Sequence, residues 1–328
     1  MKSLNSYIKD TYITEGIFKN IGADITPDEV AVGIHNILRK GSNALKSPDV
    51  VWDNERSVYI VTYKYDYGMY NFEFTQDKIS SLMDLPYGFE IHIDSNDALI
   101  GLKGDLTDEM IRFFIDTVHV THLDRLGVSN NKYLTSLDSL SAFIKDNPTV
   151  SYINIMDCPN LKSLGNISIS ECHIRVTDCG SFTGVGSAVS GRNNMLTLDD
   201  CAAASLSWIK PGVFSNINLY DCNIDVFKDV NISALNGIDL VCPAENIITP
   251  QPKGAKIGTL DIYTNNSREA KKLIQSKKID LSYKYDVMIN IRSSATISKE
   301  KMAIIAKLKE IISQTYGNFP ARINVYYV

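Results

Sequence analysis

The chain has 328 residues, of which 44% are hydrophobic and 22% are charged. This length exceeds that of one ordinary domain, so we expect two domains or one elongated repeat array, and the composition excludes a disordered or collagen-like chain. A net charge of −5 disfavours a general electrostatic affinity for nucleic acid or anionic membranes. No run of 18 apolar residues occurs, so we expect a soluble chain without a transmembrane helix.

The first 16 residues form a candidate leader. Met1–Asp10 interleaves polar and apolar residues and lacks the apolar core of a secretory signal, and Ile13-Thr14-Glu15-Gly16 has the order aliphatic, any residue, Glu, small residue. The segment resembles the capsid-targeting leader of internal head proteins of large contractile-tailed phages, which ends at a protease site of this form. The resemblance implies cleavage between Glu15 and Gly16. The alternative is an ordinary amphipathic N-terminal helix, and a looser match at 169–172 shows that the pattern is permissive.

Residues 17–88 are predicted to form an α+β N-terminal cap. The run Thr26-Pro27-Asp28-Glu29 supplies a helix cap, a first-turn proline and acids that face the helix dipole, which predicts a helix over 30–39. Segments 57–64 and 69–74 alternate aromatic and polar residues about a turn, which predicts a β-hairpin. Basic residues are sparse among its aromatic side chains, so we interpret these as packing on the next segment rather than as a stacking platform for nucleic acid.

A repeat begins near residue 90. Each copy has two aliphatic residues that flank a third residue, then Asn or Cys three positions later, then apolar residues at three-residue steps. Segments 126–137 and 153–164 match slot for slot, and later copies keep only the first half of the pattern. The second aliphatic stands at positions 93, 128, 155, 176, 198, 219, 240, 262 and 281, so the middle copies recur every 21 or 22 residues. This period predicts a stack of similar structural units.

The spacing resembles the leucine-rich-repeat family, whose short strands stack in parallel along one face. The resemblance covers about residues 90–285 and implies an α+β fold with an irregular solenoid over 89–285. The longer early steps leave room for helices, and apolar residues at helical spacing predict two of them, over 106–117 and 137–146. These helices would form the outer face.

One position in each early copy holds Asn or Cys where the chain leaves the strand. In leucine-rich repeats an inward Asn at this place bonds loop backbone, and Cys replaces it as a small buried residue. The resemblance therefore implies one structural column, with metal or redox chemistry as the alternative. Because no C-x-x-C pair occurs, we expect reduced thiols in a cytoplasm. The column is Asn96, Asn131, Cys158, Cys179, Cys201 and Cys222.

Residues 286–328 are predicted to form a β-α-β cap. The sequence indicates a strand over 287–291, an amphipathic helix over 298–316 that stops at Gly317, and a last strand over 322–328. This unit would close the exposed end of the solenoid. The helix carries several lysines, but Glu300 and Glu310 dilute their charge, so we interpret it as a solvated face rather than a membrane-surface helix.

Few features of the sequence indicate enzymatic chemistry. Phosphate-binding, dinucleotide-binding and H-E-x-x-H motifs are absent, and the five histidines are scattered. His119 and His122 could share one helical face, but nothing in the sequence is placed to complete a metal site with them. The sequence predicts no enzyme, no cofactor and no metal.

The outward residues of the repeat form a candidate interaction surface. In a parallel strand the residue between two inward aliphatics points outward and stacks with its equivalents. We expect an acidic, aromatic patch that binds a basic partner protein, with a purely solubilising face as the alternative. The patch is Tyr220, Asp239, Asp261, Tyr263 and Asp280. A second acidic column precedes the Asn or Cys position, where aspartate also favours turns. It is Asp157, Asp178, Asp200 and Asp221.

The sequence favours a non-enzymatic protein-interaction solenoid. The leader resemblance further implies that the chain is a phage-encoded protein that is carried in the head or acts on a host protein. One alternative is a cytoplasmic bacterial leucine-rich-repeat adaptor without a virion role, and another is an enzyme whose site is not visible in the sequence. We expect a protein partner, without nucleic acid or membrane, and a location in the host cytoplasm or in a phage head.

Overall fold

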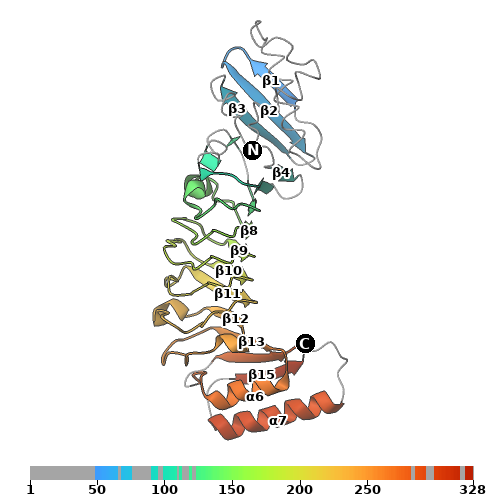
Figure 1. Ribbon diagram of the computed structural model, residues 1–328, viewed down its shortest axis with the longest axis vertical. Helices are drawn as coiled ribbons and strands as arrows, with labels where there is room; N and C mark the ends of the chain where they lie inside the picture. Colours follow the sequence, from blue (N-terminus) through green and yellow to red (C-terminus); the bar gives the residue numbers. More distant parts are fainter. Residues whose placement is uncertain are drawn as a thin grey trace. The chain divides into compact units, whose positions relative to one another are not determined.

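The computed structural model describes residues 49–65, 68–75, 90–94, 99–108, 111–112, 118–119, 123–281, 285–292, 299–317 and 322–327. The chain divides into two compact units, and Figure 1 labels the helices and strands within them. One comprises residues 1–134 with 142–158, and the other comprises residues 135–141 with 159–328. The secondary structure is α+β. The predictions for the leader, for the helix over 30–39 and for Asn96 fall on residues outside this description.

The predicted hairpin belongs to an antiparallel sheet in the first unit. β2 (Val58–Tyr65) pairs with β3 (Gly68–Thr75), which confirms the hairpin, and both strands are rich in the aromatic and β-branched residues that favour sheets. β1 (Asp49–Asp53), which the sequence did not predict, pairs with β2. The short β6 (Val118–His119) pairs with β3.

The first unit also contains the earliest parallel strands. β5, β7 and β8 run parallel, whereas β4 is antiparallel to β5. Leu102 of β5 aligns with Val128 of β7, so β5 is the first parallel strand. The sequence placed the first aliphatic pair of the repeat at residues 91 and 93, but these lie in β4, which is antiparallel to β5. The connection between β4 and β5 is too short for the crossover that parallel strands require. The strands are β4 (Glu90–Asp94), β5 (Leu99–Lys103), β7 (Arg125–Ser129) and β8 (Tyr152–Met156).

The early predicted helices are partly present. A 3-10 turn, η1 (Asp138–Leu140), leads into α5 (Ser141–Asp146), which confirms a helix within 137–146. For the segment 106–117 the structure describes helical backbone at 108, 111 and 112, and the rest of the predicted helix lies outside the description.

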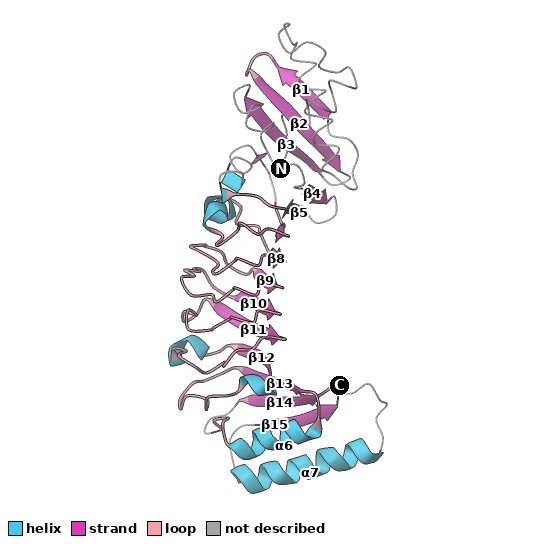
Figure 2. Cartoon of the chain, viewed as in Figure 1, coloured by secondary structure: helices cyan, strands magenta, loops and turns pink. Residues whose placement is uncertain are grey.

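In the second unit, parallel strands follow one another in sequence order (Figure 2). Their inward aliphatics align from strand to strand, as Ile174 with Leu196 and Leu196 with Ile217. Two 3-10 turns, η2 (Ile232–Leu235) and η3 (Ala244–Asn246), lie in the connections. The strands are β9 (His173–Thr177), β10 (Asn194–Asp199), β11 (Phe214–Tyr220), β12 (Asp239–Pro243) and β13 (Thr259–Thr264).

Two predicted aliphatic pairs are displaced in the structure. Leu240 aligns with Ile217 and Leu260, so the inward pair of β12 is Leu240 and Cys242 rather than residues 238 and 240. The predicted pair at 279 and 281 precedes the next strand, whose inward residues include Val287. Both errors have one cause, because several alternating apolar residues precede each strand and the sequence offers more than one register.

The C-terminal strands alternate with helices. β13 is followed by α6 (Ser267–Ser276), β14 (Asp286–Ile291), α7 (Lys299–Tyr316) and β15 (Arg322–Tyr327), and β13, β14 and β15 are parallel. The predicted strand, helix and strand of the cap are therefore present, whereas α6 was missed. The Asn266 side chain accepts bonds from the Arg268 and Glu269 amides and so caps α6, which ends at Lys277 with φ 55°.

Among the described residues, none of the helices is both long and apolar enough to cross a membrane.

Candidate functional site

The strands of the second unit have a buried face and an outward face. Leu196, Leu198, Ile217 and Leu219 are fully buried, and the residues between them are more exposed. We call the outward-pointing residues of β9 to β14 the outward face. One row is His173, Met195, Asn216, Asp239, Thr259 and Asp286, and the next is Arg175, Thr197, Asn218, Val241, Asp261 and Met288.

The strand ends show why aspartate recurs before the Asn or Cys position. Asp178, Asp200 and Asp221 have φ of 53°, 49° and 47°, in the left-handed region that Asp and Asn tolerate best among residues with a side chain. The amide of Asp178 donates to Asp199 O at 3.0 Å, and that of Asp200 donates to Tyr220 O at 3.1 Å. These aspartates form the turns that end the strands. Asp157 has the same backbone conformation, with φ 53°, in the first unit.

Asn131 organises the corresponding turn in the first unit. Its Nδ2 donates to Leu106 O at 2.9 Å, and its Oδ1 accepts from the amides of Tyr133 and Leu134 at 2.8 and 3.0 Å. The residue is fully buried. One side chain thus satisfies two buried backbone groups, Leu106 O and the Leu134 amide, and a third that is part-buried.

Cysteine takes this place in the later turns. Cys158, Cys179, Cys201 and Cys222 are buried thiols that form no disulfide bond. The Cys179 thiol donates to Thr177 O at 3.2 Å, a weak bond within its own turn. Hydrogen bonding with Cys201 and burial raise the pKa of the Cys222 thiol, which disfavours the reactive thiolate. Among the described residues, no group of three or more His, Cys, Asp or Glu is placed to hold a metal ion.

The expected column of Asp239, Asp261 and Asp280 does not form. Asp239 aligns with Thr259, and Asp261 aligns with Val241, so the two carboxylates stand in different rows of the outward face. Asp280 lies in the loop between α6 and β14, where its amide donates to Gln251 Oε1 at 3.1 Å. Asp286, which the sequence analysis did not select, occupies the row of Asp239 two strands away. The register separates these carboxylates with uncharged residues and so reduces their repulsion.

Tyr263 is fixed by the absence of a backbone donor in β12. Tyr220 O accepts from Asp200 on the β10 side, so the preceding carbonyl, Leu219 O, faces β12. The paired register of β11 and β12 ends at Asn218 and Val241, and its continuation would make Pro243, which has no N–H, the donor to this carbonyl. The Tyr263 hydroxyl, from the strand beyond, donates to Leu219 O at 2.6 Å instead. Burial raises the pKa of Tyr263, which keeps this hydroxyl a donor.

The two predicted tyrosines are in contact. The rings of Tyr220 and Tyr263 stack with centroids 5.9 Å apart and planes inclined by 24°. The Arg292 guanidinium carbon lies 4.0 Å from the centroid of the Tyr263 ring, a cation–π contact that the sequence analysis missed. Asp261 lies two residues before Tyr263 in β13, and Asn290 donates to its carboxylate. Burial raises the pKa of Asp261.

A polar network covers the outward face at β9 and β10. Arg175 donates to Thr177 Oγ1 at 3.0 Å and to Asp199 Oδ2 at 2.8 Å. His173 Nε2 lies 2.8 Å from Thr197 Oγ1, and burial, together with the nearby Arg175 charge, lowers the pKa of His173. The network therefore holds Arg175 and Asp199 as a fixed charge pair.

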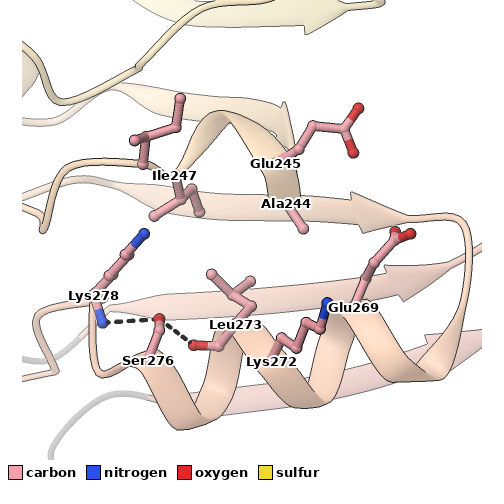
Figure 3. Close-up of a pocket in the computed structure, with 9 residues that line it drawn as sticks. Ala244, Glu245, Ile247, Glu269, Lys272, Leu273, Ser276 and Lys278 are labelled. Atoms are coloured by element: carbon pink, nitrogen blue, oxygen red, sulfur yellow. Dashed lines mark hydrogen bonds between the residues drawn. The ribbon is translucent and has the colours of Figure 1, made fainter.

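A pocket of about 320 Å³ lies between the η3 turn and α6 (Figure 3). Its wall includes the buried Ala244, Ile247 and Leu273, and Ile248 on its rim is 53% exposed. The charged lining residues are Glu245, Glu269, Lys272 and Lys278. Two acids and two bases give the pocket no preferred ligand charge, and Glu269 already accepts bonds from the residues that cap α6. The outward face is the more defined site.

Comparisons with protein families, with curated proteins and with solved structures find nothing that matches this chain.

Proposed function

We propose that the chain is a non-enzymatic interaction protein, an irregular leucine-rich-repeat-like solenoid whose outward face binds a basic segment of a partner protein. The charge of the outward face carries this proposal. Asp239 and Asp286 are exposed and Asp261 is partly exposed, whereas Arg292, the one cation among the described side chains from β12 to residue 292 on this face, is stacked on Tyr263. The remaining carboxylates are left to attract a cationic partner.

The aromatic residues support the same surface. Interaction surfaces are enriched in tyrosine and arginine, because these side chains bury a large area and still form directional contacts. Here Tyr263 contacts both Tyr220 and Arg292, one row of the outward face beyond Asp261. Their mutual contacts fix them before a partner binds, which lowers the entropy lost on binding.

The test is partner capture by charge-reversal variants. The variant Asp239→Lys/Asp286→Lys reverses two exposed charges on the outward face, and Asp146→Lys reverses one exposed charge at the end of α5 as a control. From a lysate of the native source, we expect the wild-type chain and the control to capture the same protein through cross-links to the outward face. The double variant should lose it. Capture that the double variant retains contradicts the proposal.

A virion role is the narrower form of this proposal. It depends on the leader resemblance of Met1–Gly16, and its test is the intact mass of the chain in purified virions. A chain that begins at Gly16 in particles supports a processed head protein. A full-length chain that is absent from particles favours the cytoplasmic adaptor.

A further inference from the structure

The aromatic stack on the outward face has a buried middle member, Tyr263, and a partly exposed end member, Tyr220. Tyr263 lies in contact with both Tyr220 and Arg292 and is only 8% exposed. Arg292 follows β14 and Tyr220 ends β11, so the two partners of Tyr263 come from opposite sides of β13. Tyr220 remains partly exposed. Its ring therefore offers surface on which a further planar or cationic group can stack.

Carboxylates flank the Tyr220 ring. Asp199 is the register partner of Tyr220 on β10, and Asp221 follows Tyr220 in the chain and is exposed. Asp199 Oδ2 accepts from Arg175 at 2.8 Å, and the Asp199 side chain keeps 24% of its surface exposed. An ionised carboxylate has about four lone-pair sites and can accept from a second donor. Arg175 offsets the charge of Asp199, and the exposed Asp221 leaves the groups around Tyr220 with a net negative charge that favours a cation.

We propose that Tyr220, Asp199 and Asp221 form an acceptor site for an arginine side chain of the partner protein. This inference rests on the proposed function and names the chemistry of its partner. The chain already shows both contacts with its own residues, since the Arg292 guanidinium stacks on a tyrosine and the Arg175 guanidinium binds Asp199. A partner arginine would extend the row Arg292, Tyr263, Tyr220 by one member.

Arginine fits this site better than lysine does. The guanidinium is planar and weakly hydrated, so it can stack on the Tyr220 ring while its edge donates to a carboxylate. An ammonium is compact and strongly hydrated and forms only the point-charge contact. A nucleic acid is disfavoured because its phosphates would approach Asp199 and Asp221.

The test uses three short glycine-flanked peptides that differ in one residue type, carrying two arginines, two lysines or two citrullines. Citrulline has nearly the shape of arginine without its charge. The full chain is titrated with each peptide and the binding constants are measured by NMR or calorimetry. We expect the arginine peptide to bind about threefold more tightly than the lysine peptide, and the citrulline peptide to show no measurable binding.

Two substitutions, Tyr220→Leu and Asp221→Asn, test whether the arginine peptide binds at this site. Tyr220→Leu removes the ring and should weaken the arginine peptide about three- to fivefold, while Tyr220→Phe keeps the ring and should leave binding unchanged. Asp221→Asn removes one charge but keeps a residue that tolerates the left-handed turn at φ 47°, and it should weaken binding about twofold. Thermal unfolding of each variant shows that a loss of binding is not a loss of fold.

The outcomes separate this inference from the proposed function. If the arginine and lysine peptides bind equally well, the arginine site is overturned. If that binding is also lost in Asp239→Lys/Asp286→Lys, the proposed acidic interaction face is still supported. An arginine preference that survives Tyr220→Leu also overturns it, because the arginine then binds elsewhere. If neither cationic peptide binds more tightly than the citrulline peptide, both proposals fail.

Discussion

The two faces of the second-unit sheet follow different rules. On the buried face, aliphatic side chains occupy the same register on successive strands, as Leu198 beside Leu219, because close packing leaves little freedom in size and shape. On the outward face the residues change from strand to strand, from the Arg175–Asp199 pair to the Tyr220–Tyr263 stack. Packing thus explains the repeat, and specific chemistry is concentrated on the face that does not repeat.

The largest effect should come from truncating the buried face. Leu198 is fully buried in β10, so Leu198→Ala should lower the free energy of unfolding by about 3 kcal/mol through lost burial and the cavity left behind. Met195 points outward from the same strand, and Met195→Ala should cost less than about 1 kcal/mol. Denaturant unfolding of the two variants measures the difference. Similar losses would show that the two faces do not differ in packing.

A comparable decrease in the free energy of unfolding is expected when Asn131, in the turn of the first unit, is replaced. Asn131→Ala leaves the buried Leu106 O and Leu134 amide and the part-buried Tyr133 amide without this partner, which should cost about 3 kcal/mol. Cys179→Ala at the matching turn of the second unit removes the weak thiol bond to Thr177 O and some packing, and should cost about 1 kcal/mol. Chemical denaturation of both variants tests this order, and a larger loss for Cys179→Ala would reverse it.

A smaller decrease in the free energy of unfolding should follow from Tyr263→Phe, which removes the donor to Leu219 O. The unpaired buried carbonyl should cost about 1–2 kcal/mol. Pro243→Ala restores an N–H in register with the same carbonyl, so in that background the cost of Tyr263→Phe should shrink. Thermal unfolding of the two single variants and the double variant completes the cycle. Strictly additive losses would refute this account of the tyrosine.

The smallest effect concerns Asp261 and depends on pH. Burial raises the pKa of Asp261 in the folded state, so the folded chain is favoured by protonation and loses stability as pH rises through that folded pKa. Asp261→Asn removes the charge and keeps an oxygen that can accept from Asn290. The variant should be at least as stable as the wild type at neutral pH, and any gain should vanish in acid, where the wild-type carboxyl is protonated. A stability gain of Asp261→Asn that grows as pH falls would contradict this prediction.

Much of the fold is readable from the sequence because burial imposes strict patterns. The β2–β3 hairpin, the aligned aliphatics of β9 to β11, and the strand, helix and strand at the C-terminus all follow from periodicity and turn residues. The register of β12 was wrong because residues 238, 240 and 242 are all apolar and any two of them suit a strand. Hydrophobicity alone therefore leaves a slip of two residues undecided, since it keeps the same face buried.

The candidate site is less predictable because it depends on that register. Tyr220 and Tyr263 were selected from their positions and do lie in contact, but the bond from the Tyr263 hydroxyl to Leu219 O joins residues 44 positions apart, and no periodic pattern predicts it. Arg292 follows the end of its strand and carries no repeat signal. Asp286 was missed because the strand predicted over 287–291 was assigned to the C-terminal cap, so its outward residues were not considered part of the repeat. Contacts between distant segments leave no periodic trace in a single sequence.

The most direct test of the outward face as a binding surface is carboxylate labelling with a carbodiimide and a small amine. The chain is labelled with and without the arginine peptide, and the modified residues are identified by mass spectrometry. The account predicts protection of Asp199 and Asp221, with the exposed Asp146 of α5 and Glu300 of α7 labelled equally in both samples. Equal labelling of Asp199 and Asp221 with and without bound peptide, or protection confined to Asp146 or Glu300, would contradict it.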